Sequence, residues 1–282
     1  MKLVRFGPIG HEKPGIINKD NRRLDISGFG EDYNEAFFEN EGTKRLSEWL
    51  TSNASSCPEV DDSERWGAPV QRPSKIVCVG LNYAPHAEES KMELPKEPIL
   101  FFKATSALCG PFDQVRLPKD ANKVDWEVEL AVVMGKKATN VSESEALDHI
   151  VGYSILNDVS ERHFQLERGG QWVKGKSADT FAPMGPYLAT KDEIADPHKL
   201  DIWLKVNGET RQNSSTSHLI FNIPHLVSYI SGFMTLLPGD IISTGTPSGV
   251  GLGFDPPVFL KPGDTMELGI EGLGISKQEV IG

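Results

Sequence analysis

Two glutamates, two positions apart in an otherwise apolar strand, constrain this chain more than any other feature. Glu127 and Glu129 lie in the run Asp125–Met134, DWEVELAVVM, whose Val, Leu and Trp content predicts a β-strand. Side chains alternate along a strand, so both glutamates share one face with Ala131 and Val133. The other face is apolar throughout. We therefore expect a strand that is covered on both sides.

The two glutamates carry like charges on one face, and each is costly to remove from water. A divalent cation would relieve both costs, but spacing alone fits equally well with two hydrated glutamates at a strand end. A third carboxylate, Asp158, ends another apolar run, Val151–Asp158. Three carboxylates without histidine or cysteine are hard ligands. They suit Mg²⁺, Mn²⁺ or Ca²⁺ better than zinc.

Composition narrows the possible partners and location. The net charge is −11, and there is no basic run, which argues against nucleic acid or an anionic membrane as a partner. No segment approaches the roughly 18 consecutive apolar residues of a membrane span. Met1–Gly7 lacks the apolar core of a signal peptide. The three cysteines have no metal or redox spacing, so we expect a cytoplasmic protein with reduced thiols.

The pattern of elements predicts an α+β, β-rich fold with two domains. Residues 1–70 are expected to form a small N-terminal α+β domain, with a partly helical stretch over Tyr33–Leu50, and residues 71–282 a second domain dominated by short strands. Ser142–Glu145 forms a capping box, and Ile223–Met234 is the best long helix. The absence of regular alternation between strands and helices argues against Rossmann and TIM-barrel folds. The expected strands are Lys2–Phe6, Gly15–Asn18, Arg23–Ile26, Lys75–Gly80, Pro98–Phe102, Trp126–Met134, Val151–Asp158, Gly185–Ala189, Leu200–Val206, Asp240–Thr244 and Thr265–Gly269.

A second group of residues could carry proton transfer and anion binding. His86 and Glu89 are three apart on a predicted helical turn, so they are neighbours on one face. Such a pair suits a general base, although spacing alone favours an incidental pair on a solvated turn. Arg162 and Lys176 would hold a carboxylate or stabilise an enolate beside a metal. Taken singly, each is typical of a surface side chain.

Taken together, these segments resemble the fumarylacetoacetate hydrolase family. The matching segments occur in the family's order and cover residues 73–270, and the stretch 164–170, FQLERGG, is similar to a subgroup that includes 2,4-diketo-3-deoxy-sugar-acid hydrolases and ureidoglycolate lyases. The resemblance implies a mixed β-roll, a Mg²⁺ or Mn²⁺ cofactor and a homodimer. The segments are VGLNYAPHAEE (79–89), LFFKATSALCGP (100–111), DWEVELAVVMGK (125–136), GYSILNDVSERHFQ (152–165), KSADTFAPMGP (176–186) and TGTPSGVG (244–251).

The resemblance also implies roles for individual residues. It implies that Glu127, Glu129 and Asp158 are the metal ligands, that His86 and Glu89 activate water, and that Lys176 is the catalytic lysine because it opens the K-S-x-D-T-F-x-P pattern. The positions that match substrate-binding residues are Arg162, Gln165, Thr246 and Lys103.

The implied activity is hydrolysis of the C3–C4 bond of a small 2,4-dioxo acid, an acylpyruvate or a 2,4-diketo-3-deoxy sugar acid, to pyruvate and a carboxylic acid. Ureidoglycolate cleavage, oxaloacetate decarboxylation and isomerisation are alternatives on the same site. A non-catalytic metal-binding protein is an alternative of another class. The presence of His86, Glu89 and Lys176 argues against it, since a binding module needs no base beside the metal.

Overall fold

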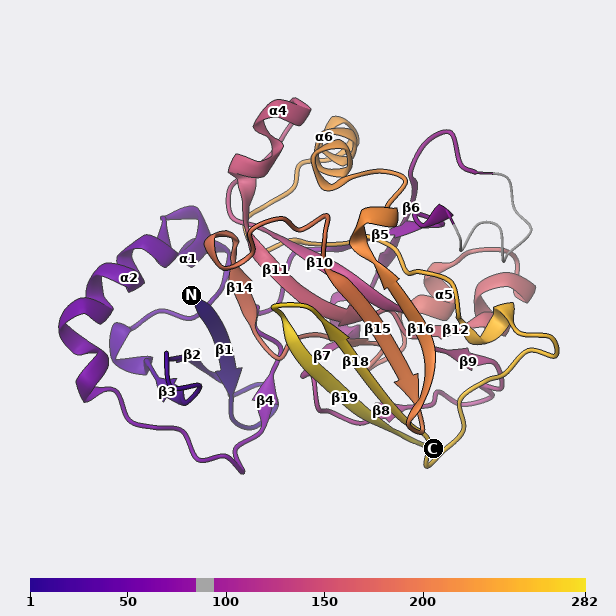
Figure 1. The fold of residues 1–282 in the computed structure, drawn as a ribbon, viewed down its shortest axis with the longest axis horizontal. Helices are drawn as coiled ribbons and strands as arrows, with labels where there is room; N and C mark the ends of the chain where they lie inside the picture. Colours follow the sequence, from indigo (N-terminus) through magenta and orange to yellow (C-terminus); the bar gives the residue numbers. More distant parts are fainter. Residues whose placement is uncertain (85–93) are drawn as a thin grey trace.

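Two large β-sheets organise the computed structural model, which describes residues 1–84 and 94–282 (Figure 1). The larger sheet has ten strands, nine of them in the order β3-β2-β1-β14-β11-β10-β17-β5-β6, with β4 beside β1. The second has five, in the order β16-β15-β18-β19-β8. Short helices flank the sheets. This mixed, strand-rich architecture confirms the α+β class expected from the sequence.

The strands and the longer helical segments have the following bounds. The strands are β1 (Lys2–Phe6), β2 (Lys13–Ile17), β3 (Arg23–Asp25), β4 (Trp66–Gly67), β5 (Ile76–Gly80), β6 (Ile99–Lys103), β7 (Leu108–Cys109), β8 (Val115–Arg116), β9 (Val124–Asp125), β10 (Val128–Met134), β11 (Ile150–Asn157), β12 (Ser160–Glu161), β13 (Ala182–Pro183), β14 (Leu188–Thr190), β15 (Asp201–Val206), β16 (Glu209–Ser215), β17 (Ile241–Ser243), β18 (Thr265–Ile270) and β19 (Gly274–Ile281). The helical segments are α1 (Glu35–Glu39), α2 (Gly42–Asn53), α4 (Glu143–Ala146), α5 (Val173–Lys176), α6 (Ile223–Phe233) and the π-helical turn η5 (His163–Glu167).

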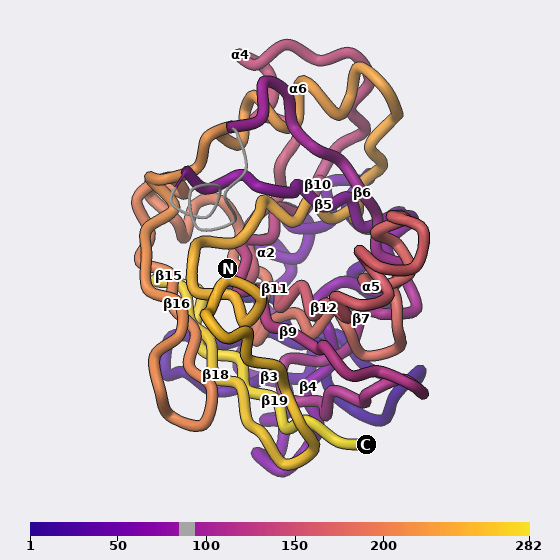
Figure 2. Tube along the Cα trace, turned by 90° about the vertical axis from the view of Figure 1, so that its right-hand side faces the viewer, coloured from indigo at the N-terminus to yellow at the C-terminus, as the bar shows by residue number. Residues whose placement is uncertain are grey.

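The centre of the molecule is the antiparallel pair β10 and β11. Every residue of β10 is buried, as expected for a strand covered on both faces. The second sheet packs on this pair through β15, β18 and β19. In the quarter-turned view of Figure 2, β15, β16, β18 and β19 lie along one side of the molecule, and α5, β7 and β12 along the other. Side chains at the ends of β10 and β11 are therefore enclosed on several sides.

The N-terminal region continues the large sheet. β1 pairs antiparallel with β14, and β2 and β3 follow outward. Two polar contacts hold this region together. Arg5 Nε donates to Asp32 Oδ1 at 2.9 Å in a partly buried contact, and the buried Tyr33 hydroxyl donates to the carbonyl of Gly15 at 2.6 Å. A boundary at residue 70 stays a prediction, and the shared sheet shows that the two parts are joined by backbone hydrogen bonds.

Local sequence signals locate most elements to within a few residues. The capping box at Ser142 forms, and α6 begins after Asn222, whose side chain accepts a hydrogen bond from the N–H of His225. The helical stretch expected over Tyr33–Leu50 is two helices, α1 and α2, separated at Glu41, which adopts a φ of 53°. In the parts of the chain that the structure describes, no helix combines the length and apolar character needed to cross a membrane.

Candidate metal centre and active site

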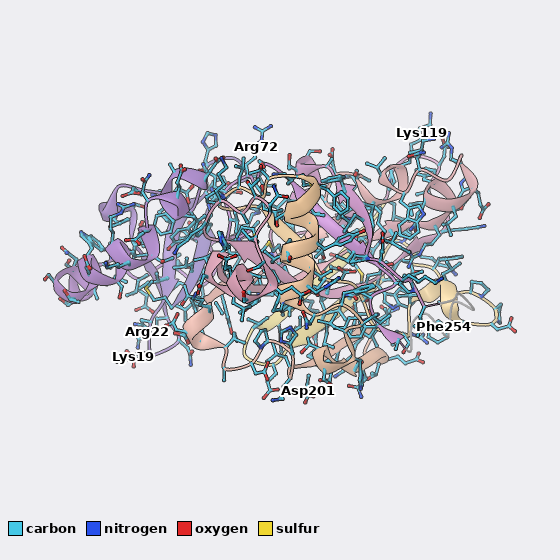
Figure 3. All side chains as sticks on the ribbon, turned by 90° about the horizontal axis from the view of Figure 1, so that it is seen from above. Lys19, Arg22, Arg72, Lys119, Asp201 and Phe254 are labelled. Carbon is cyan, nitrogen blue, oxygen red and sulfur yellow. The ribbon has the colours of Figure 1, made fainter. Side chains whose placement is uncertain are left out.

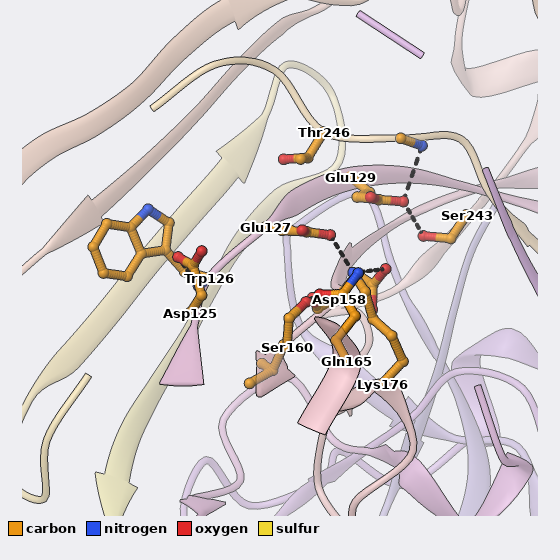
Figure 4. Close-up of polar contacts among 12 residues, drawn as sticks. Asp125, Trp126, Glu127, Glu129, Asp158, Ser160, Gln165, Lys176, Ser243 and Thr246 are labelled. Atoms are coloured by element: carbon orange, nitrogen blue, oxygen red, sulfur yellow. Dashed lines mark hydrogen bonds and ion pairs between the residues drawn. The ribbon is translucent and has the colours of Figure 1, made fainter. Parts of the chain in front are cut away.

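Three carboxylates converge where β10 begins and β11 ends. The antiparallel register pairs Val128 with Asn157, which sets Glu127 and Asp158 side by side. The N–H of Asp158 donates to the carbonyl of Glu127 at 2.9 Å. One carboxylate oxygen from each of Glu127, Glu129 and Asp158 lies within 4.8 Å of the other two, and all three residues are buried (Figure 4). The structure thus brings together the three predicted ligands.

Two lysines contact this carboxylate cluster. Lys176, the last residue of α5, places Nζ 2.6 Å from Glu127 Oε2 and 2.8 Å from Asp158 Oδ2. Lys103 places Nζ 2.5 Å from Asp158 Oδ1 and 3.0 Å from the carbonyl of Val159. Both lysines are buried. The cations offset part of the repulsion among the carboxylates.

Arg162 connects the cluster to a fourth buried carboxylate. Its guanidinium contacts Asp125 Oδ2 at 2.8 Å and Glu127 Oε1 at 2.7 Å, and Nη1 donates to Gln165 Oε1 at 3.0 Å. Asp125 Oδ1 also accepts the N–H of Gly251 at 2.6 Å. The sequence analysis did not single out Asp125, although this residue opens the run that contains Glu127. A carboxylate at the start of an apolar strand is a signal that a buried arginine could pair with it.

Glu129 differs from the other members of the cluster. Oε2 accepts hydrogen bonds from the Ser243 hydroxyl at 2.5 Å and from the N–H of Gly245 at 2.9 Å, both neutral donors. No side-chain cation bonds it directly within residues 1–84 and 94–282. Burial, together with the charges of Asp158 and Glu127, raises the pKa of Glu129 well above its ordinary range.

Glu127 and Lys176, in contrast to Glu129, lie beside groups of opposite charge that stabilise their charged forms. Burial would raise the pKa of Glu127, but the charges of Lys176 and Arg162 outweigh it and lower the pKa to about 2. Burial would lower the pKa of Lys176, yet Asp158 and Glu127 outweigh it and raise the pKa. Glu129 is thus the carboxylate whose negative charge is least compensated. A divalent cation bound by three buried carboxylate oxygens would compensate it, so the donor set fits Mg²⁺ or Mn²⁺.

The residue that supports Thr246, Gln212, comes from a strand that the sequence analysis missed. Thr246 Oγ1 donates to the carbonyl of Val128 at 2.9 Å and accepts from Gln212 Nε2 at 2.8 Å. Gln212 Oε1 in turn accepts the N–H of Val128 at 3.0 Å. Gln212 lies in β16, ETRQNSS, which has no apolar alternation to mark it as a strand.

A cavity of about 630 Å³ opens over the cluster. Lys103 and Asp158 are both absent from its lining and fully buried. Phe254, which lines the cavity, lies at the end of the molecule opposite Lys19 and Arg22 (Figure 3). His86 and Glu89, the predicted water-activating pair, lie outside the described residues. The predicted site residues that line the cavity are Glu127, Glu129, Arg162, Gln165, Lys176 and Thr246.

Known proteins resemble the chain along its whole length. A protein of Burkholderia orbicola, named provisionally as a hydrolase, is 50% identical over 97% of this chain and 96% of its own. The structure of fumarylacetoacetate hydrolase from Exiguobacterium antarcticum superposes with a TM-score of 0.85 at 35% identity, covering 100% and 99% of the two chains. Maleylpyruvate hydrolase from Sphingobium sp. SYK-6, in complex with manganese(II) and pyruvate, gives 0.83 at 31% identity with the same coverage.

The profile described as "Fumarylacetoacetate (FAA) hydrolase C-terminal" matches residues 75–281, which contain the carboxylate cluster and all the residues found to line the cavity over it. With this match and the full-length relatives, the sequence, the fold and the site agree: the chain belongs to the fumarylacetoacetate hydrolase family of enzymes.

Proposed function

We propose that the protein is a metal-dependent hydrolase that cleaves the C3–C4 bond of a 2,4-dioxo acid of the acylpyruvate type, releasing pyruvate and a carboxylic acid. The observation that carries the proposal is Lys176, whose ammonium group bridges Glu127 and Asp158 at the floor of a cavity large enough for such an acid. The neighbour that holds manganese(II) and pyruvate supports the same substrate class.

We assign Glu127, Glu129 and Asp158 as the ligands of Mg²⁺ or Mn²⁺. When bound there, the metal supplies a Lewis acid for the oxo-acid end of the substrate. Asp125, Arg162 and Lys103 hold the ligands in place, since each bonds a ligand or its immediate partner and is itself buried.

The cavity-lining donors bind the substrate and the charge that develops on it. Lys176 Nζ is placed to stabilise the oxygen of the leaving pyruvate enolate, which is otherwise a poor leaving group. Arg162 donates a hydrogen bond to the side-chain oxygen of Gln165, Oε1. Because Gln165 lines the cavity, this bond orients its side-chain amide there. We assign this amide and the Thr246 region to the substrate carboxylate.

Water activation falls to His86 and Glu89 in this proposal. The imidazole would take a proton from the water that attacks C4, and the carboxylate would orient the ring. Decarboxylation of oxaloacetate requires no attacking water. His86→Ala should therefore abolish hydrolysis of a dioxo acid while leaving metal binding unchanged, and retention of full hydrolysis would remove His86 from the mechanism.

The decisive experiment measures pyruvate release from a simple acylpyruvate, a 2,4-diketo-3-deoxy sugar acid and oxaloacetate, with Mg²⁺ or Mn²⁺ and then with chelator. Glyoxylate release from ureidoglycolate is followed in parallel. Metal-dependent pyruvate release from a diketo acid is the expected result. Turnover of oxaloacetate alone would reassign the enzyme as a decarboxylase, and glyoxylate alone as a lyase. A change in substrate absorbance without pyruvate release would favour isomerisation.

A further inference from the structure

The cavity over the carboxylate cluster is lined by two chemically different groups of side chains. Most of the charged and hydrogen-bonding side chains of the described lining belong to the cluster or to its partners, whereas most of the other described lining side chains are apolar. Among the residues that the structure describes, Asp255 is the one charged side chain of the lining that is neither part of the carboxylate cluster nor bonded to it. The apolar part of the wall includes Phe101, Leu166, Trp172, Val250, Leu252 and Phe254.

No cation of the described lining is free to bind a second carboxylate. The two lining cations are Arg162 and Lys176, and both are already hydrogen-bonded to carboxylates of the cluster. A substrate tail that ended in a carboxylate would be desolvated against the apolar wall and would approach Asp255, a group of the same charge. An uncharged tail would avoid both costs and would bury apolar surface.

Among the apolar lining side chains, Trp172 is held in position by several contacts. It precedes α5, and its carbonyl accepts the N–H of Lys176 at 3.2 Å, so the two residues lie one helical turn apart. Its ring packs edge-on against Phe101, with centroids 5.2 Å apart. It also lies over Gly80, where an added Cβ would come within 2.7 Å of the indole. The backbone at Gly80 thus makes room for the indole ring at the cavity wall.

We propose that this site selects 2-oxo acids with an uncharged, apolar tail, and that Trp172 is the specificity-determining residue that packs against the tail. The inference rests on the proposed function for the placement of the oxo-acid group at the carboxylate cluster. It narrows the substrate to acylpyruvates with an aliphatic or aryl acyl group, in preference to those that carry a second carboxylate.

The test compares two ligands of equal chain length, 2-oxoheptanoate and 2-oxoheptanedioate, with pyruvate as the ligand without a tail. Neither seven-carbon acid has the 4-oxo group that hydrolysis requires, so calorimetry with Mg²⁺ present measures binding alone. We expect 2-oxoheptanoate to bind at least about tenfold more tightly than the dioate, the scale on which an apolar pocket discriminates small changes in a ligand.

Two variants and a control assign the effect to the wall. Trp172→Ala should weaken binding of 2-oxoheptanoate about tenfold and leave pyruvate within about twofold. Val173→Ala changes the adjacent, exposed side chain, which is not part of the lining, and should change neither ligand. Leu166→Lys introduces a cation at a lining position that is 46% exposed, so it should fold normally and strengthen binding of the dioate.

Equal or tighter binding of the dioate by the unmodified protein would overturn the proposal. A loss of pyruvate affinity in Trp172→Ala as large as the loss for 2-oxoheptanoate would overturn the role given to Trp172. The proposed function fails separately: if hexanoylpyruvate releases no pyruvate while 2-oxoheptanoate still binds preferentially, the site selects apolar oxo acids but does not hydrolyse this bond.

Discussion

Lys103 and Lys176 hold opposite oxygens of one buried carboxylate, that of Asp158, at 2.5 and 2.8 Å. The two lysines are not equivalent, because Lys176 lines the cavity whereas Lys103 is fully buried outside the lining. The same buried carboxylate is thus bonded by one lysine that lines the cavity and by one that does not. In the proposed function, Lys176 acts on the substrate, whereas Lys103 only positions a metal ligand.

Replacement of these lysines should therefore have different consequences. Lys176→Met removes the donor at the cavity floor and should lower kcat by about 10²–10³, as loss of one preorganised oxyanion donor does. Lys103→Met should mainly reduce stability, by about 3–5 kcal/mol, because it breaks a buried ion pair. Steady-state kinetics and denaturant unfolding of both variants check this. A Lys103 variant with normal stability and a Lys176-like loss of kcat would contradict the distinction.

Metal binding should depend most directly on Glu129. Glu129→Gln keeps the shape of the side chain but removes the carboxylate whose charge is least compensated, so we expect Mn²⁺ affinity to fall by more than about 100-fold. Ser243→Ala removes only its hydrogen-bond donor and should cost about 10–100-fold. Calorimetric titration with Mn²⁺ measures both. Unchanged affinity in Glu129→Gln would remove Glu129 from the ligand set.

Added metal should also stabilise the folded protein. The cluster is assembled only in the native chain, so a ligand of that cluster raises Tm with concentration. Thermal unfolding of the wild-type protein should shift upward between chelator and millimolar Mg²⁺, and the shift should be absent in Glu129→Gln. The same shift in both proteins would indicate that Mg²⁺ acts elsewhere.

Asp125 should matter more for stability than its absence from the predicted site suggests. It is fully buried and bonds both the Arg162 guanidinium and backbone N–H groups of the loop at Gly251. Asp125→Ala removes one of the two carboxylates that bond the buried Arg162, and it leaves the N–H of Gly251 without its acceptor, so it should cost about 3–5 kcal/mol of unfolding free energy. Denaturant unfolding in chelator measures the loss, and Asp148→Ala, at an exposed position, should stay within about 0.5 kcal/mol.

The sequence locates the carboxylates because their signal is local. Glu127, Glu129 and Asp158 lie at or beside apolar strands, and an antiparallel register of those strands is enough to bring them together. The residues that support the carboxylates from other strands carry no such local signal. Gln212 and Ser243 reach the cluster from β16 and β17, and pairing over long sequence separations cannot be deduced from periodicity.

Residues 1–70 are expected to be necessary for folding rather than an independent appendage. β1 covers the edge of β14, Leu3 and Val4 are fully buried, and Arg65 bonds Glu12 on one side and Asp113 of the catalytic region on the other. Deletion of residues 1–70 would leave a strand edge unpaired and apolar core exposed, so the truncated chain should unfold or aggregate. Circular dichroism and size-exclusion chromatography with light scattering check this, with Arg65→Ala as a milder variant that should fold with reduced stability. A monodisperse truncated chain with wild-type turnover would instead establish residues 1–70 as a separate domain.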